Sequence, residues 1–143
     1  MPGSAVPGSA SPRDVIDHLV QGISAGRWEE LDDLYAEDAV VEYPMALPGG
    51  PARLAGRAAI RRYFAAVARL PLELRAHHVV VHETRDPEVV IAEYDYDGLV
   101  TTTGRSFQVA NIQVSRVRDG QILTSRDYHN HPVLADAAAE RIR

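Results

Sequence analysis

The sequence contains no cysteine and no lysine, and these two absences exclude several kinds of chemistry. Without cysteine the chain has no thiol nucleophile, no disulfide bond and no thiolate ligand for a metal or cluster. All 15 residues with a fixed positive charge are arginine, so a Schiff base on a lysine amine is excluded as well. Any catalysis must therefore use Asp, Glu, His, Tyr, Ser, Thr or Arg side chains, or a bound metal.

The sequence also lacks the features that suit a nucleic acid or a membrane. A net charge of -5 at pH 7 gives no basic surface for nucleic acid or anionic lipid. No apolar run approaches the roughly 18 residues of a membrane span, and no secretory signal pattern opens the chain. We therefore expect a cytoplasmic protein that binds neither nucleic acid nor a membrane.

The length and composition indicate one folded domain. The 143 residues, of which 45% are hydrophobic, suffice for a core of ordinary size. Residues 1–10 are rich in Pro, Gly, Ser and Ala and predict a disordered tail. Residues 11–143 remain as a single domain, without internal repeats.

The first half of the chain has the periodicity of helices. Ser11-Pro12-Arg13-Asp14 combines a capping hydroxyl, a proline in the first turn and an acid, which predicts a helix start. Apolar residues then recur at helical spacing until Gly26. The elements predicted next are a short helix over residues 28–35, a strand over 39–43, an irregular loop over 44–55 and a helix that ends at Leu70-Pro71.

From Leu72 onward the hydrophobic period changes from 3.6 to 2, which predicts strands. The four predicted strands are residues 72–84, 89–97, 106–118 and 122–130, and a short final helix follows from Pro132. Asp119-Gly120 between the last two is a strong hairpin signal. Three helices followed by antiparallel strands predict an α+β fold, in which a cone-shaped curved sheet wraps around the N-terminal helices. The mouth of such a cone suits a small molecule.

Two parts of the chain carry a family resemblance. Residues 34–44 and 56–64, which flank the proline- and glycine-rich loop, resemble the front half of ketosteroid isomerases and SnoaL-like polyketide cyclases, in the nuclear transport factor 2-like (NTF2-like, cystatin-like) superfamily. Residues 83–93, 103–105, 116–122 and 126–128 resemble a SnoaL-like subgroup close to the phenazine biosynthesis A/B proteins. The resemblance spans residues 11–130. It implies the cone fold, which hosts isomerases, cyclases, hydrolases, dehydratases and non-catalytic binders.

The residues of a ketosteroid isomerase are mostly replaced. Those enzymes carry their aspartate base at the position that directly precedes the matching proline. In this chain the proline is Pro44, and the residue before it is Tyr43. The position of the oxyanion-hole tyrosine is occupied by Leu19 in this chain, and the position of the oxyanion-hole acid lies near Gln113. Because a tyrosine with a pKa near 10 does not replace a carboxylate base, we do not expect steroid isomerisation by the usual residues.

The final strand offers a different acid. In the SnoaL-like and phenazine A/B families a carboxylate on this strand points into the cavity, and the resemblance implies this role for Asp127. The period of the strand puts Leu123, Ser125, Asp127 and His129 on one face. A carboxyl group in an apolar cone has its pKa raised by desolvation. The alternative is that Asp127 pairs with an arginine at the sheet surface.

Glu93 is the second candidate acid. It shares one strand face with Asp95 and Asp97, and the opposite face carries Tyr94 and Tyr96. If the acidic face lines the cone, Glu93 meets Asp127 and the two carboxyl groups can divide acid and base roles. Otherwise the acids form a solvated strand end and the tyrosines pack inward.

The six histidines raise the question of a metal. Asp127, His129 and His131 have a spacing that suits Zn²⁺ or Fe(II), but His131 falls where the strand should end. We therefore expect no metal and no organic cofactor, and we expect His129 to bond to Asp127 or relay a proton to it. Tyr43 is the expected hydrogen-bond donor to a substrate oxygen, which completes a predicted catalytic set of Asp127, Glu93, His129 and Tyr43.

Other side chains are candidates for ligand contact. Tyr43 and Met45 lie at a strand end beside an irregular loop, where binding residues are common, whereas Trp28 and Phe64 suit the core better. The predicted ligand-binding set is Trp28, Met45, Tyr63, Phe64, His78, Asn111, Gln113 and Ser125.

The predicted function is cofactor-independent acid–base chemistry on an apolar or aromatic metabolite, by cyclisation, isomerisation, condensation or dehydration. A polyketide-like or phenazine-like intermediate of secondary metabolism would fit. The alternative is a non-catalytic module that binds a hydrophobic ligand in the same cone. A third possibility is epoxide hydrolysis, for which the resemblance implies an Asp-Arg-Asp arrangement. The chain has Asn111 and Gln113 at the positions where additional charged residues would be needed, which counts against this reaction.

We also expect a homodimer, because the broad sheet of this fold leaves one face to bury against a partner. The candidate residues for that face are Tyr94 and Tyr96, or Gln108, Ile112 and Val114.

Overall fold

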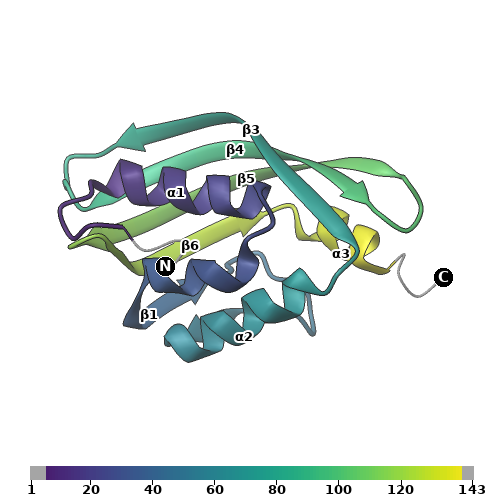
Figure 1. The fold of residues 1–143 in the computed structure, drawn as a ribbon, viewed down its shortest axis with the longest axis horizontal. Coiled ribbons are helices and arrows are strands. Elements are labelled where there is room, and N and C mark those ends of the chain that lie inside the picture. The colour runs from purple at the N-terminus through teal and green to yellow at the C-terminus, as the bar shows by residue number, and fades with distance from the viewer. Residues whose placement is uncertain (1–5, 140–143) are drawn as a thin grey trace.

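The computed structural model describes residues 6–139. Along these residues the elements are α1 (Pro12–Ser24), the 3-10 helix η1 (Trp28–Leu34), β1 (Tyr35–Glu42), β2 (Arg53–Ala55), α2 (Arg57–Ala68), β3 (Leu72–Glu83), β4 (Val89–Val100), β5 (Ser106–Arg118), β6 (Gln121–His129) and α3 (His131–Ala139). The fold is α+β, with a curved mixed sheet that does not close (Figure 1). None of the described helices is long and apolar enough to cross a membrane.

The strand order of the sheet is β2-β1-β6-β5-β4-β3. The strands β3 to β6 pair antiparallel, as the alternating pattern and the hairpin signals predict. β1 instead runs parallel to β6, with Glu42 opposite Arg126. Since these two side chains are exposed, the next residues along the strands, Tyr43 and Asp127, face the interior together.

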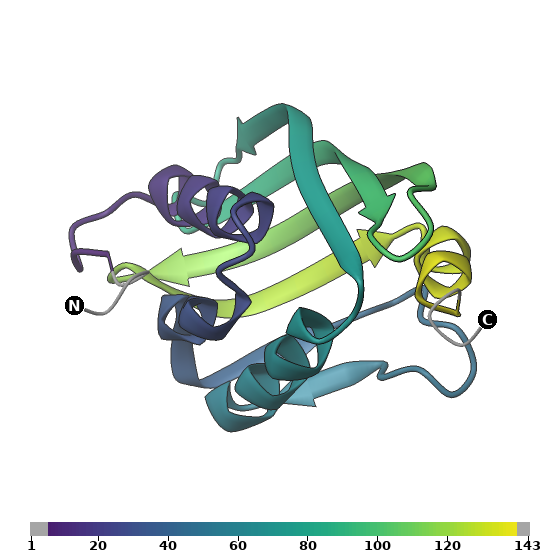
Figure 2. The same cartoon turned by 45° about the vertical axis from the view of Figure 1, so that its right-hand side comes forward.

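The helices α1, η1 and α2 cover one face of the sheet, and α3 lies at the opposite end of the sheet from the start of α1 (Figure 2). α1 begins with the predicted capping box, in which the Ser11 Oγ accepts a hydrogen bond of 3.1 Å from the Asp14 backbone N–H. Its apolar face packs onto a core that reaches Ile122 on β6. Burial of this face, rather than helix propensity, supplies most of the stability of such a helix.

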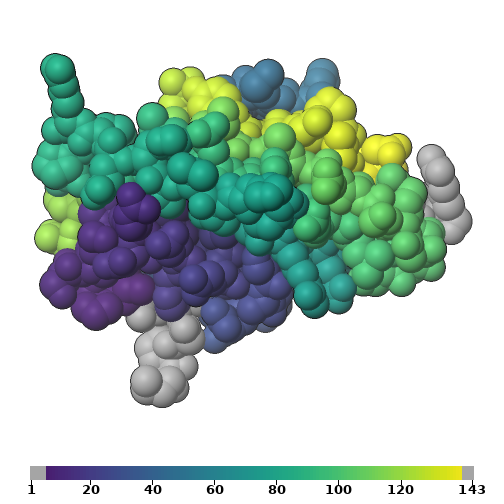
Figure 3. Space-filling model, turned by 90° about the horizontal axis from the view of Figure 1, so that it is seen from above, coloured from purple at the N-terminus to yellow at the C-terminus, as the bar shows by residue number. Residues whose placement is uncertain are grey.

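α1 lies along β3, as the view from above shows (Figure 3). Two hydrogen bonds fasten the pair. The Arg13 guanidinium donates to the Val81 carbonyl at 3.0 Å, and the Ala76 backbone N–H donates to the Ser24 hydroxyl at 2.9 Å. The curvature of β3 is therefore held against the helix at both ends.

β3 contains a bulge. His77 lies opposite Asp95 and Val80 lies opposite Glu93, so two residues, His78 and Val79, face the single partner Tyr94. His78 has a φ of 54°, in the left-handed region that most residues avoid. Such a bulge bends the strand and re-aims its side chains.

Several boundaries differ from the predicted ones. The second helix ends at Leu34, because Tyr35 already pairs with Ile122 as the first residue of β1. β4 continues to Val100, past the predicted turn at Gly98. The loop after β1 contains the short strand β2, which pairs with β1. Of the tail predicted over residues 1–10, residues 1–5 lie outside the described part, and Val6 packs against the core.

Candidate active site

A cavity of about 410 Å³ lies between the concave face of the sheet and the helices. Its wall is mostly apolar and includes five aromatic rings and four polar groups. The aromatic members are Trp28, Tyr43, Tyr63, Tyr94 and Tyr96, and the polar members are Gln113, Asp127, His129 and His131. A largely apolar cavity with a few converging polar groups is the usual form of a small-molecule site.

Asp127 projects from β6 into this cavity and is 7% exposed. Burial raises the pKa of its carboxyl to about 7, because the charged form loses its hydration. A hydrogen bond from the Ser125 hydroxyl, 2.5 Å long, acts in the opposite direction and stabilises the carboxylate. The interior position predicted for Asp127 is thus the one found, and a surface ion pair with an arginine is not.

The Asp127 carboxyl lies at the end of a chain of buried hydrogen bonds. The Tyr94 hydroxyl donates to the Gln113 side-chain carbonyl at 3.1 Å, and the Gln113 amide donates to the Ser115 hydroxyl at 3.1 Å. The Ser115 and Ser125 hydroxyls are 3.0 Å apart. Because Ser125 donates to Asp127, it accepts from Ser115, and every donor in the chain points toward the carboxyl.

His129 stands beside Asp127 with a defined orientation. Asn111 donates through its side-chain amide to the carbonyls of Tyr94 and Val109, so its carbonyl oxygen faces His129 Nδ1 at 2.6 Å. His129 Nδ1 is therefore the protonated nitrogen, and Nε2 is left as an acceptor, 3.9 Å from Asp127 Oδ2. Burial lowers the pKa of His129 to about 4, which keeps the ring neutral.

Tyr43 and His131 complete the polar side of the cavity. Burial raises the pKa of Tyr43 well above its usual value, so its hydroxyl stays protonated and can donate. The Tyr43 ring lies 5.7 Å from Tyr63 and 6.0 Å from His129, measured between ring centroids. The Nε2 atom of His131 is enclosed and has no hydrogen-bond partner among the described residues. A ligand in the cavity is a natural partner for it.

Glu93 does not meet Asp127, and this corrects the prediction. It lies on the outer face of β4, where it bonds to His82 at 2.6 Å. The inward face of β4 carries Tyr94 and Tyr96, each 4% exposed, which was the alternative arrangement. The cause is energetic, since tyrosine buries a large apolar area, whereas a carboxylate costs several kcal/mol to desolvate.

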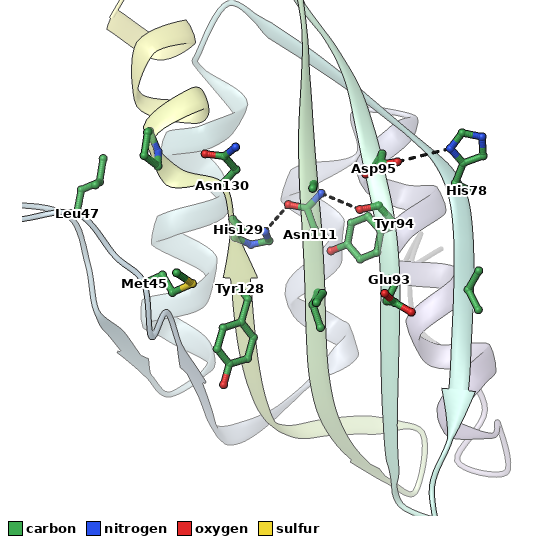
Figure 4. Close-up of a pocket in the computed structure, with 14 residues that line it drawn as sticks. Met45, Leu47, His78, Glu93, Tyr94, Asp95, Asn111, Tyr128, His129 and Asn130 are labelled. Carbon is green, nitrogen blue, oxygen red and sulfur yellow. Dashed lines mark hydrogen bonds and ion pairs between the residues drawn. The ribbon is translucent and has the colours of Figure 1, made fainter.

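Two predicted ligand contacts also lie outside the cavity (Figure 4). Met45 is 63% exposed, and His78 projects from the β3 bulge toward Asp95. Both border an open hollow of about 790 Å³ on the outer face of the sheet, where Ile112 and Tyr128 also lie. The irregular loop and the bulge turn these side chains away from the cone.

The other predicted contacts divide into two groups. Trp28, Tyr63 and Gln113 line the cavity as expected. A second group is buried behind the wall instead, where Phe64 packs against aromatic rings, Asn111 holds His129 and Ser125 supports Asp127.

Four residues of the site lie outside the predicted catalytic and ligand-binding sets. Ser115 belongs to the buried chain, His131 and Tyr96 line the cavity, and Tyr94 does both. The period-2 pattern of β4 and β5 carried the signal for Tyr94, Tyr96 and Ser115, which alternate with exposed or half-exposed residues.

Asp127, His129 and His131, which were considered as possible metal ligands from their spacing, are not arranged as a metal site. The His129 Nε2 atom and the Asp127 carboxyl are 3.9 Å apart, and within residues 6–139 these three do not bring donor atoms to metal-binding spacing. The cavity wall formed by the described residues also lacks an arginine, which weighs against an Asp-Arg-Asp epoxide hydrolase.

A comparison with known protein families agrees with the architecture. The family model of the SnoaL-like domain matches residues 16–124. The chain belongs to the SnoaL-like family. An uncharacterised PhzA/B-like protein of Pseudomonas aeruginosa is 34% identical to this SnoaL-like chain over 120 residues, which are 82% of this chain and 83% of that protein. The family resemblance inferred from the sequence is confirmed.

Solved structures support the same assignment of the SnoaL-like chain. The crystal structure of a provisionally named isomerase from Bacillus subtilis has a TM-score of 0.81 and 31% identity, covering 88% of this chain and 91% of that one. The crystal structure of a provisionally named polyketide cyclase from Pseudomonas putida has a TM-score of 0.73 at 18% identity, covering 92% and 100%. The second likeness concerns the fold alone, and the predicted NTF2-like α+β fold is confirmed.

Proposed function

We propose that this SnoaL-like protein is an enzyme in which Asp127 is the general acid and base for cofactor-independent chemistry on an apolar or aromatic metabolite. The observation that carries the proposal is the Asp127 carboxyl, buried in an aromatic cavity with a pKa raised to about 7. A group with a pKa near the working pH both takes and returns a proton. The names of similar proteins, an isomerase, a polyketide cyclase and a PhzA/B-like protein, favour secondary metabolism as the setting.

The proposed reaction is proton transfer next to a carbonyl, the step common to cyclisation, isomerisation, condensation and dehydration. It needs a base at the carbon and a hydrogen-bond donor at the oxygen. Ionised Asp127 is the base, and the protonated hydroxyl of Tyr43, which directly follows the neighbouring strand β1, is the donor. Neutral His129 presents an acceptor nitrogen 3.9 Å from Asp127 Oδ2, which faces the carboxyl while Asp127 holds the proton.

The test uses exchange of carbonyl-adjacent protons for deuterium, which reports proton transfer without knowledge of the product. A panel of aromatic and polyketide-like ketones is incubated with the protein in D₂O and followed by NMR. The wild type should accelerate exchange for members of the panel, at a rate that rises with pH through about 7 as Asp127 ionises. Asp127→Asn should lower this rate by about 10²- to 10⁴-fold.

Asp38→Asn, the same substitution at an exposed position of β1, is the control and should leave the rate unchanged. An exchange rate that Asp127→Asn does not alter would refute the role of Asp127. Ketones that quench Trp28 fluorescence without any exchange in the wild type would instead support the binding module. The convergence of Asp127, His129 and Tyr43 on one cavity favours the enzyme, because a binder needs fewer titratable groups.

The proposed assembly is a homodimer formed through the outer face of the sheet. Ile112 is 43% exposed, Val80 is 49% exposed, and both line the hollow on that face. Gln108 and Val114 share the outward side of β5 with Ile112. Tyr94 and Tyr96 are not available for the dimer, because they are buried in the cone.

A further inference from the structure

The outer side of the β3–β4 pair carries a cluster of histidine and carboxylate side chains, separate from the cavity. His77 Nδ1 lies 2.9 Å from Asp97 Oδ2, and His78 Nδ1 lies 3.5 Å from Asp95 Oδ2. The two imidazole rings are in contact, with centroids 4.2 Å apart. One donor atom from each of His77, His78 and Asp95 lies within 4.8 Å of the other two. Figure 4 shows His78 turned toward Asp95 across the two strands.

The bulge of β3 is what brings the two histidines together. In a regular strand, neighbouring residues point to opposite faces. His77 is in register with outward-facing Asp95, and a regular His78 would point inward beside Tyr94. The φ of 54° at His78 re-aims its ring to the outer side. A non-glycine residue in this region carries strain, and such strain is frequent at functional sites.

The His77–Asp97 contact is not an ordinary hydrogen bond. Nδ1 of His77 is enclosed, and although Asp97 Oδ2 is only 2.9 Å away, the two groups are not aligned as donor and acceptor. Two atoms bound to one Zn²⁺ at about 2.0–2.1 Å lie about 3 Å apart and do not point at each other. The 3.5 Å between His78 Nδ1 and Asp95 Oδ2 matches such an edge of a coordination polyhedron, and the 2.9 Å contact places Asp97 Oδ2 directly beside the His77 ligand atom.

A second residue holds one of the carboxylates in place. The Gln108 side-chain amide on β5 donates to Asp97 Oδ1 at 3.1 Å, which leaves Oδ2 directed toward His77. Metal-binding carboxylates are commonly oriented in this way by an outer hydrogen bond.

We propose that His77, His78 and Asp95, with Asp97 beside them, form a binding site for one divalent transition-metal ion such as Zn²⁺. Two imidazole nitrogens and a carboxylate oxygen are ligands that Zn²⁺ prefers, and the set leaves room for further ligands. The bound ion would tie the bulge of β3 to β4 at the edge of the sheet. It takes no part in the proton transfer at Asp127.

The test is a calorimetric titration of chelator-treated, tag-free protein with ZnCl₂ at pH 7.5. The wild type should bind one equivalent of Zn²⁺. His78→Asn, which keeps a residue that tolerates positive φ, should weaken binding by about tenfold or more, because it removes a ligand. His82→Asn is the matched control, since His82 lies on the same strand face but bonds to Glu93 outside the cluster.

Circular dichroism establishes that each variant keeps the wild-type fold. One-to-one binding that His78→Asn weakens and His82→Asn preserves supports the site. The proposal is overturned if the wild type binds no Zn²⁺, if His78→Asn binds as tightly as the wild type, or if the two variants lose affinity equally. Asp95→Asn should behave like His78→Asn, and it distinguishes the three-ligand site from binding to histidine alone.

Discussion

The carboxyl of Asp127 is subject to two opposing influences. The apolar wall favours the protonated form, whereas the hydrogen bond from Ser125, backed by Ser115 and Gln113, favours the carboxylate. Burial is the larger effect, so the pKa stands at about 7 rather than 3.8. The same environment that suits proton transfer is therefore a cost to folding whenever the carboxyl is ionised.

This cost predicts how stability depends on pH. The folded protein holds the Asp127 proton up to about pH 7, whereas the unfolded chain releases it near pH 3.8. The contribution of Asp127 to the free energy of unfolding therefore decreases as the pH rises between these values. The Asp127→Asn variant has no titratable group at this position, so it does not show this loss. Its free energy of unfolding, relative to the wild type, should therefore increase by about 3 kcal/mol between pH 4.5 and pH 8.

Urea unfolding at the two pH values measures this difference. Buried His129, with its pKa lowered to about 4, destabilises the fold as pH falls from 6.5, but it does so in both proteins and cancels in the comparison. A stability difference that does not change with pH would show that Asp127 ionises normally in the folded state.

At the scale of single elements, the pairing of β4 with β5 depends on a close approach at Gly98. The sequence indicates a turn there, but Gly98 lies within β4 opposite Phe107, and the Phe107 ring covers it. A Cβ atom at this position would clash with the Phe107 ring. A glycine inside a strand often marks such an approach, which a turn signal alone does not distinguish.

Gly98→Ala should accordingly lower the free energy of unfolding by about 1–3 kcal/mol, because the ring and the strands must shift. Urea unfolding provides the measurement. Gly8→Ala is the control, since a Cβ there would meet only an ordinary contact of 3.6 Å. Adding Phe107→Leu should recover part of the loss in a double-mutant cycle. Equal stability of Gly98→Ala and the wild type would show that the ring moves freely.

Most helices and strands follow from patterns in the sequence, whereas their faces and irregularities do not. The helix start at Ser11 and the hairpin at Asp119-Gly120 are each specified by a few neighbouring residues, and the structure has both features where they were predicted. The orientation of β4 was ambiguous because both of its faces begin with apolar residues. The bulge at His78 depends on contacts between β3 and its neighbours, so no nearby turn residue announces it.

The candidate site was predictable only in part for the same reason. The interior position of Asp127 was predictable because its strand alternates clearly and the family resemblance implied a carboxylate that points into the cavity. The bond between His129 and Asn111 and the contact between Ser115 and Ser125 join β6 to β5, and the contact of His131 with Tyr43 joins residues 88 positions apart. No spacing along one strand encodes such contacts.

At the scale of the whole molecule, the sheet has one face covered by helices and one face open. The outer face combines the exposed apolar side chains of Ile112 and Val80 with the hollow bordered by Met45. Apolar side chains that cluster around a hollow are typical of a surface that binds a partner. In the proposed homodimer, a second copy of the chain covers this face.

Ile112→Glu should shift the dimer toward monomer, because burying an unpaired carboxylate at the interface is costly. Analytical ultracentrifugation over a range of concentrations gives the dissociation constant. Gln21→Glu, which adds the same charge at an exposed position of α1, should sediment like the wild type. A monomeric wild type, or equal dissociation of both variants, would contradict the proposed interface.

The parallel pairing of β1 with β6 joins the first long strand of the chain to the last. Contacts between such distant segments form late, because nearly all of the intervening chain must be ordered before they gain anything. During synthesis on the ribosome, β1 has no long partner until β6 emerges. Tyr43 and Asp127 thus come together only once β6 is in place, and any chain released before β6 is translated carries Tyr43 but lacks Asp127 and His129.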